Sequence, residues 1–218
     1  MVVDSNIGFN KVNALVDEKL TYEVDLSNLD APIGNLTVVH TNAASKDVPC
    51  KQWGLSSQNS YANLMNRCYW NYLRVYKPAG TQLLDAAPHA VPGEWMILGE
   101  SVPARVDMLD LYNGGVNNTQ AFGTLLVVPG GTSLETSFQF LLPSNVIVST
   151  NSTRIKVYQL RAQKQPGTLA LPLEIRIRLP AGAKILDTTP EAKREVDGLY
   201  FDTDLWKDVV IKIVFQMP

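Results

Sequence analysis

Apolar and polar residues alternate along most of this chain, and this alternation limits the fold more than any other feature of the sequence. From residue 20 to residue 26 the even positions are apolar and the odd positions are polar. Successive side chains of a β-strand point to opposite faces, so such a segment can bury one face and expose the other. Similar runs occur at Leu36–His40, Tyr72–Tyr76, Thr124–Val128, Ser137–Leu141, Arg154–Gln159, Leu173–Leu179 and Val209–Phe215.

Glycine- and proline-containing segments separate these runs, as expected for turns between short strands. They are Ala31-Pro32, Pro78-Ala79-Gly80, Pro129-Gly130-Gly131, Gln165-Pro166-Gly167 and Pro180-Ala181-Gly182. Helix is expected only in short pieces, near Asn10–Val16 and Asn59–Met65, because no long amphipathic helical pattern is present. The sequence therefore predicts an all-β protein built from immunoglobulin-like β-sandwiches.

Two segments repeat, which predicts that the sandwich is duplicated. Tyr72–Pro88 and Glu174–Pro190 share a Pro-Ala-Gly turn followed by Leu-Asp, and Phe138–Pro143 is similar to Ile213–Pro218. Chance similarity between strands is the alternative, but both repeats occur in the same order, which favours duplication. We expect a lead-in segment at residues 1–15, a first lobe at residues 16–144 and a smaller second lobe at residues 145–218.

The predicted first lobe carries two long insertions, Thr41–Asn71 and His89–Phe122. In sandwiches, binding residues concentrate on such loops while the strands serve as a scaffold. The second lobe is short enough that it should depend on the first for part of its stability.

The two cysteines, Cys50 and Cys68, both lie in the first insertion. They lack CxxC spacing, and neither histidine lies at a zinc-ligand spacing from them. The remaining alternatives are a disulfide, which we predict, and two buried free thiols. A disulfide closing a loop of this length would contribute about 3 kcal/mol of stability and would indicate an oxidising compartment.

Charge excludes some partners. The net charge is −2 and only 18% of residues are charged, with Lys and Arg scattered singly, so no basic stripe is available for nucleic acid. No apolar run reaches the roughly 20 residues needed to cross a bilayer, which predicts no membrane insertion by this segment. The N-terminal residues do not form a signal peptide. If the protein is exported, we expect the chain to be a fragment of a larger anchored precursor.

Three segments resemble a known family. Asp4–Val12 is similar to the D-x-N-x-G-x-N-K-V segment of the bacterial and archaeal domain of unknown function family 4012. Cys68–Tyr76, followed by Pro78 and Gly80, resembles another segment of that family, and Gln163–Thr168 resembles its KQPGT segment. The resemblance implies a cell-envelope location beside a membrane anchor. It also makes a glycan a candidate partner, but it implies no established activity.

Known catalytic motifs are missing from the sequence. It has no GxSxG, no HExxH and no glycine-rich phosphate loop. His40 lies in a predicted strand and His89 in a proline-flanked loop, and neither has a recognisable catalytic partner. Glycoside hydrolysis would need two facing carboxylates. Residues of the second insertion that could supply such a pair are Glu94, Glu100, Asp107 and Asp110. Because loop carboxylates are usually solvated, we expect that the protein is not an enzyme.

Calcium is the one ion with a candidate site, although we expect no resident cofactor. The tract 107–118 is rich in carboxylate and amide oxygens, which calcium prefers. The candidate ligands are Asp107, Asp110, Asn113 and Asn117. The alternative is a turn whose Asp and Asn side chains cap their own backbone. If calcium binds there, it should affect stability and not chemistry.

Aromatic residues in the two insertions are the candidate ligand-binding residues: Trp53, Tyr61, Trp70 and Trp95. Exposed aromatic rings stack on sugars and on partner proteins, whereas buried ones fill the core. The sequence thus predicts a non-catalytic extracellular or cell-surface module, structural or adhesive, whose partner is a protein or a glycan. The alternatives are a carbohydrate-binding module and an enzyme acting on envelope polysaccharide. The oligomeric state is left open.

Overall fold

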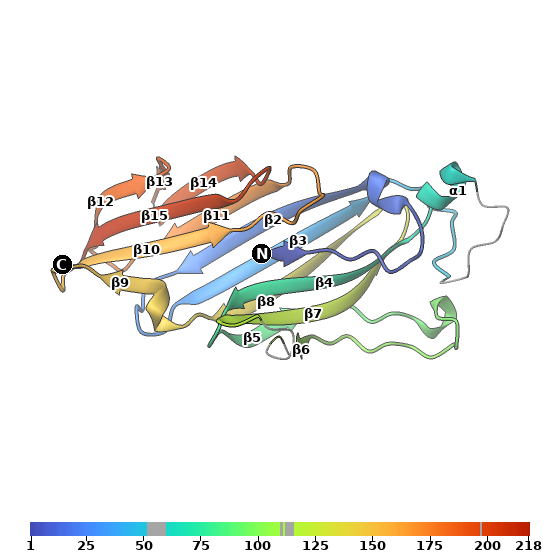
Figure 1. Ribbon diagram of the computed structural model, residues 1–218, viewed down its shortest axis with the longest axis horizontal. Coiled ribbons are helices and arrows are strands. Elements are labelled where there is room, and N and C mark those ends of the chain that lie inside the picture. The colour runs from blue at the N-terminus through green and yellow to red at the C-terminus, as the bar shows by residue number, and fades with distance from the viewer. Residues whose placement is uncertain (52–59, 110, 112–115, 197) are drawn as a thin grey trace.

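The computed structural model describes residues 1–51, 60–109, 111, 116–196 and 198–218 (Figure 1). Over these residues the chain is almost entirely β, with one short helix, α1 (Tyr61–Met65), and three 3-10 turns. The 3-10 turns are η1 (Val12–Leu15), η2 (Gly93–Trp95) and η3 (Ser144–Val146). Both α1 and η1 lie where short helices were predicted, and the all-β prediction is confirmed. No helix of the described residues is long and apolar enough to cross a membrane.

The strands form three sheets. The first contains, in spatial order, β1 (Val2–Val3), β4 (Tyr69–Pro78), β7 (Thr119–Val128) and β6 (Asp107–Leu109). The second contains β13 (Lys193–Glu195), β14 (Gly198–Asp204), β11 (Pro172–Arg178), β2 (Val16–Asp25), β3 (Ile33–Asn42), β8 (Thr132–Leu141) and β5 (Gln82–Ala87). The third contains β12 (Lys184–Thr189), β15 (Val209–Gln216), β10 (Ile155–Ala162) and β9 (Ile147–Ser149). Every run predicted from alternation falls on a strand, and only Leu26, Arg154 and Leu179 lie one residue beyond its ends.

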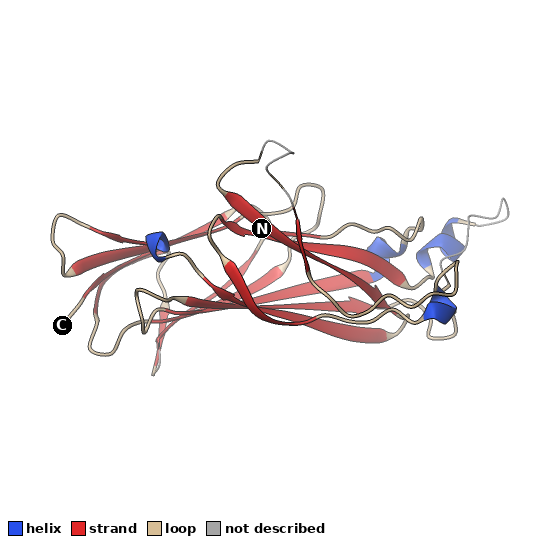
Figure 2. Ribbon diagram, turned by 90° about the horizontal axis from the view of Figure 1, so that it is seen from below, coloured by secondary structure: helices blue, strands red, loops and turns tan. Residues whose placement is uncertain are grey.

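The two four-stranded sheets pack on the same face of the seven-stranded sheet, as the edge-on view shows (Figure 2). Ile175 of β11 is paired with Tyr22 of β2, so both side chains point to that face. Between the layers a single apolar core runs through the whole length of the molecule. Phe122 of β7 and Phe140 of β8, for example, meet across the layers with ring centroids 5.2 Å apart.

The strand order repeats along the chain. In the first half, strands β2 to β8, three strands in the order β4-β7-β6 face four in the order β2-β3-β8-β5. In the second half, strands β9 to β15, three strands in the order β11-β14-β13 face four in the order β9-β10-β15-β12. In each half the seventh strand lies between the second and the fourth. In a constant-type immunoglobulin domain the fifth strand has that place, so the detailed strand order differs from the predicted immunoglobulin-like one.

The repeated sequence segments form the same corner in each half. After β4 and after β11, the Pro-Ala-Gly turn carries the chain from one sheet to the facing sheet. Gly80 and Gly182 have φ values of 85° and 76°, a conformation that glycine adopts without strain. The strand after each turn has a register shift at the same place, between Leu83 and Asp85 in β5 and between Ile185 and Asp187 in β12.

The halves share a sheet. β11 pairs in parallel with β2, which joins the strands of the second half to those of the first in one seven-stranded sheet. The predicted boundary between residues 144 and 145 falls within η3, and it stays a prediction. The second predicted insertion is not all loop, since it contains β6 and the beginning of β7.

Candidate functional site

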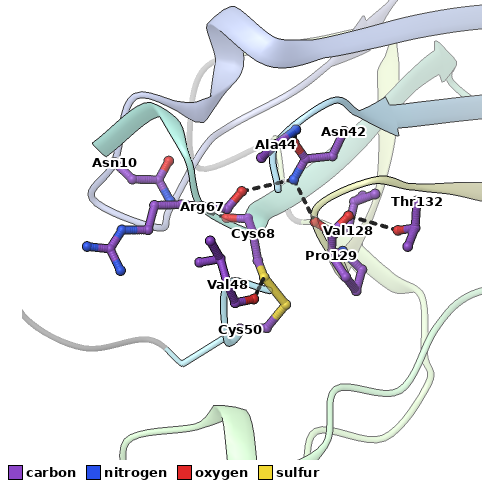
Figure 3. Close-up of a disulfide and its surroundings, with 10 residues drawn as sticks. All are labelled: Asn10, Asn42, Ala44, Val48, Cys50, Arg67, Cys68, Val128, Pro129 and Thr132. Atoms are coloured by element: carbon purple, nitrogen blue, oxygen red, sulfur yellow. Dashed lines mark hydrogen bonds between the residues drawn. A yellow bond between two sulfur atoms is a disulfide. The ribbon is translucent and has the colours of Figure 1, made fainter. Parts of the chain in front are cut away.

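Cys50 and Cys68 form a disulfide with a Cα–Cα distance of 5.2 Å, so the predicted bridge is confirmed. It ties the loop of residues 43–68 to the beginning of β4 (Figure 3). Beside it, the fully buried Asn42 donates hydrogen bonds from Nδ2 to the carbonyls of Arg67 (2.9 Å) and Val128 (3.0 Å). The loop is therefore fixed both covalently and by buried polar contacts at its base.

A second apolar cluster covers the outer face of the first sheet next to the disulfide. Its buried members are Cys50, Cys68, Trp70, Val91 and Val127. Trp70 is only 3% exposed and packs in this cluster, which favours the alternative that it fills the core. Trp95 is half-buried and packs against the same cluster. The cluster thus holds both insertions against the sheet.

The loops fixed in this way expose apolar side chains. Tyr61 is 65% exposed and Leu98 is 86% exposed, and Ile97 is similarly exposed. The segments that carry them, α1 and the loop after η2, lie at the same end of the molecule (Figure 1). Of the predicted aromatic site residues, Tyr61 is therefore the exposed one, while Trp53 lies outside the described residues.

The predicted calcium tract is not assembled as a cluster in the described part of the chain. Asp107 lies in β6 and forms an ion pair with Arg105 at 3.2 Å, and Asn117 is exposed. Asp110 and Asn113 lie outside the described residues, so the calcium prediction stays a prediction. The same holds for the carboxylate pair that a glycosidase would need.

A buried polar cluster lies elsewhere, at Asp4, Glu18 and His40, whose ligand-type atoms are within 4.8 Å of one another. His40 is completely buried, and its Nε2 lies 2.9 Å from Oδ2 of Asp4. Asn71 of β4 donates from Nδ2 to Oδ1 of Asp4 at 2.6 Å. Glu18 and His40 are paired across β2 and β3, so their side chains share the face that is turned toward the core.

The charges of this cluster are uneven. Burial, together with the negative charge of Asp4, raises the pKa of Glu18 to about 9, so Glu18 is neutral at pH 7. Burial would also raise the pKa of Asp4, but hydrogen bonds from His40, Asn71 and Glu18 hold it below its ordinary value. Burial and the nearby Asp4 raise the pKa of Tyr69, which also hydrogen-bonds Asp4. The result is one carboxylate surrounded by hydrogen-bond donors.

The cluster fits a hydrogen-bonded anchor better than a metal site. Both oxygens of Asp4 already accept hydrogen bonds, so a metal ion there would have to replace the donors His40 and Asn71 as well as the proton of Glu18. It also lacks the arrangement of a catalytic triad, because Nδ1 of the buried His40 has no partner and so holds no nucleophile.

Asp4 also joins distant parts of the chain. Its backbone N–H donates to Oε1 of Gln165 at 2.7 Å, and Nε2 of Gln165 donates to the carbonyl of Asp4 at 2.9 Å. The next residue, Ser5, donates its N–H to Oδ1 of Asn71 at 2.7 Å and accepts from Arg74 at 2.6 Å. The three segments that carry the family resemblance therefore meet here, and their polar residues hold the N-terminal segment in place.

Sequence reasoning missed this cluster, although a signal was present. Glu18 occupies the same strand face as Leu20 and Tyr22, and His40 the same face as Leu36 and Val38. Ionisable residues at inward positions of an amphipathic strand are rarely buried without partners. The partner Asp4 could not be found in this way because it lies outside any alternating run.

Comparisons with known proteins show only distant likeness in structure. The sequence matches no family model and no curated protein. A candidate nutrient-binding protein of Legionella pneumophila is 9% identical with a TM-score of 0.42, over 93% of this chain and 67% of that one. An M1 zinc metallopeptidase of Deinococcus radiodurans is 10% identical with a TM-score of 0.38, over 92% of this chain and 42% of that one. The chain thus spans less than half of the metallopeptidase.

Proposed function

We propose that this chain is a non-catalytic extracellular module that binds a partner protein through the loops at its disulfide-bonded end. The disulfide supports the location, since such bridges persist in oxidising compartments. Attachment to a cell envelope through a larger anchored precursor, and membership of the family that the three segments resemble, belong to the same proposal.

The observation that carries this function is the exposure of apolar side chains on fixed loops. Ile97 and Leu98 project from a loop whose neighbours Trp95 and Met96 pack on the disulfide cluster. A loop that is already ordered loses less entropy on binding, which favours recognition. Aliphatic side chains such as Leu98 suit a protein surface, whereas sugar rings stack on aromatic faces.

The absence of catalysis is supported by the surroundings of the histidines. His40 is enclosed between the sheets and is bound to Asp4. His89 contacts the backbone carbonyl of Glu135 through Nε2 at 2.8 Å. Neither histidine thus has a hydroxyl or thiol at its free nitrogen among the described residues, as nucleophilic catalysis requires.

A matched pair of substitutions tests the protein partner. Leu98→Asp places a charge on the exposed loop that follows η2. Leu169→Asp places a charge at an equally exposed leucine of the second half. Binding of the labelled chain to cell envelopes of the source organism should fall at least about tenfold for Leu98→Asp, as expected when a charge enters an apolar contact. Leu169→Asp should bind as the parent does. Equal binding by all three proteins would refute the proposal.

Tyr61 keeps carbohydrate binding as a second candidate function, because its exposed ring could stack on a sugar. A glycan array measures this directly with the parent chain, Tyr61→Ala and Trp95→Ala. Signals that disappear with Tyr61→Ala would favour a glycan partner, and signals at background for all three chains would remove this candidate.

A further inference from the structure

The two four-stranded sheets lie side by side on the large sheet without pairing with each other. A cavity of about 590 Å³ lies between them and is lined by the N-terminal residues and by parts of β4 and β10. Its floor includes Leu20, Leu36 and Ile175 of the seven-stranded sheet. Its walls come from residues 75–78 next to β1 and from residues 158–163. Cavities of this volume typically hold small organic ligands.

Met1, Lys77 and Arg161 are the lining residues that carry amino or guanidinium groups. The Met1 amino group donates to the carbonyl of Tyr76 and Arg161 pairs with Asp208, whereas Lys77 has no anionic partner among the described residues. Its Nζ lies 3.9 Å from the ring centroid of Tyr22 and 4.8 Å from that of Phe140. In the described part of the chain, no carboxylate lies within 4.0 Å of this nitrogen and no group accepts a hydrogen bond from it. Burial lowers the pKa of Lys77 to about 7, which shows that no nearby anion compensates its desolvation.

Two tyrosine hydroxyls in the cavity are also without partners. Tyr22 is 7% exposed and Tyr158 is 2% exposed, and both line the cavity. Within the described residues, neither hydroxyl makes a hydrogen bond to the protein. Neither oxygen is among the buried unpartnered polar atoms of the described residues, so both hydroxyls are accessible in the cavity and can donate to a bound group. The cavity thus combines an unpaired cation, two free donors and an apolar floor.

We propose that this cavity binds an amphipathic monocarboxylate, whose carboxylate pairs with Lys77 and whose alkyl tail packs on the partly exposed Val146, Val148 and Leu160 of the lining. A single unpaired ammonium matches a single negative charge, and the tyrosine hydroxyls can donate to the same carboxylate. The accessible apolar side chains of the lining, Val146, Val148 and Leu160, select a tail, since small hydrophilic anions would leave them exposed to water. This site is separate from the loop end to which a protein partner was assigned.

Decanoate is the probe, used below its micelle concentration with the intact chain in isothermal titration calorimetry. Decanol carries the tail without the charge, and acetate carries the charge without the tail. We expect decanoate to bind at one site, at least about tenfold more tightly than either control, because both the ion pair and the apolar contact contribute. Binding of decanol as tight as that of decanoate, or binding of none of the three, would overturn the proposal.

Lys77→Met removes the charge and keeps an apolar chain of similar length, so decanoate affinity should fall about tenfold or more. Lys207→Met is the matched control, since Nζ of Lys207 also lies over an aromatic ring, 4.5 Å from that of Trp206, but outside the cavity lining. The affinity of the Lys207→Met variant for decanoate should be the same as that of the parent chain. Equal losses in both variants, or no loss in either, would count against the assigned role of Lys77.

A measurement on the parent chain keeps the proposal testable if Lys77→Met does not fold. Amine acetylation, followed residue by residue with mass spectrometry, reports the access of reagent to each lysine. Saturating decanoate should protect Lys77 at least about tenfold, because a bound carboxylate holds the amine protonated and covers it. Lys207 should react at the same rate with and without decanoate. Unchanged reactivity of Lys77 at saturation would refute the site.

Discussion

The two halves of the molecule place different chemistry at corresponding positions of the same strand order. The repeated segments, and the pairing of β3 with β8 and of β10 with β15, show which residues of the two halves correspond. Four polar residues of the first half have apolar counterparts in the second: His40 corresponds to Ala162, Tyr69 to Leu171, Asn71 to Leu173 and Thr136 to Ile211. In the first half these polar residues lie at the end of the core that contacts the N-terminal segment, where His40 and Asn71 bind Asp4. The second half binds no such segment there, and its core end is apolar. The scaffold thus accepts either chemistry.

The connection between corresponding strands is also longer in the first half than in the second. Between β3 and β4 the first half has residues 43–68, with α1 and the disulfide, whereas the corresponding connection in the second half is residues 163–171. Additions to a scaffold concentrate where recognition occurs. The difference supports the proposal that recognition lies in the first half and that the second half serves as support. The repeated corners are what duplication of one sandwich unit would produce, and duplication stays a prediction.

The largest expected effects come from two corresponding core residues. Phe140 and Phe215 are both completely buried, and each is paired with the strand that follows the repeated turn. Phe140→Ala and Phe215→Ala should each lower the free energy of unfolding by about 3–5 kcal/mol, through lost burial and a residual cavity. Urea denaturation followed by circular dichroism should show one transition in both variants, because the halves share a sheet. Leu169→Ala, an exposed control, should change stability by less than about 0.5 kcal/mol.

Two separate transitions in either phenylalanine variant would break this part of the comparison. They would mean that the halves unfold independently despite the parallel pairing of β11 with β2.

Removal of the disulfide should affect the halves unequally. Cys50→Ala with Cys68→Ala should lower the free energy of unfolding by about 3 kcal/mol, the value expected for a closed loop of this length. Hydrogen exchange should speed up in residues 43–50 and 60–68 while β10 to β15 keep their protection, because the second half contains no cysteine. Equal loss of protection in both halves would show that the bridge supports the whole fold.

The polar cluster of the first half should also make stability depend on pH, whereas the apolar residues at the corresponding positions of the second half do not titrate. The pKa of Glu18 is about 9 in the folded chain, against about 4.3 in an unfolded one. Between these values the folded chain holds a proton that the unfolded chain has released, so stability is full below about pH 4.3 and is lost as the pH rises toward 9. The slope is at most about 1.4 kcal/mol per pH unit.

Glu18→Gln should flatten this slope between pH 6 and pH 9, because the amide can donate to Asp4 without titrating. Urea denaturation at several pH values measures it. Glu174→Gln, on the outer surface beside Lys19, is the control and should leave the slope in place. A slope that is unchanged in Glu18→Gln would mean that another group causes the pH dependence.

How much of this structure the sequence predicts depends on whether the signal is local. Each run with alternating apolar and polar residues proved to be a strand, because the alternation of buried and exposed side chains is a property of each segment by itself. The disulfide was one of two alternatives, and the structure decided between them. The contacts of Asp4 with His40 and Gln165 could not be predicted, because they join segments that no local pattern connects. The cavity around Lys77 arises between two sheets, so it exists only after the parallel pairing of β11 with β2.

The smallest expected effect compares the repeated corner itself. Gly80 and Gly182 have similar positive φ values, and a Cβ at either position would meet only a proline at 3.6 Å or more, Pro143 or Pro218. Gly80→Ala and Gly182→Ala should therefore each cost about 1 kcal/mol, from backbone strain and not from a clash. Asparagine tolerates this conformation better, so Gly80→Asn and Gly182→Asn should cost less than the alanine variants in the same urea titration. Costs that match between the two positions would sharpen the comparison, because the turns would then be equivalent in energy as well as in shape. A clearly larger cost at Gly80 would show that the corner next to the insertions carries strain that the second half lacks.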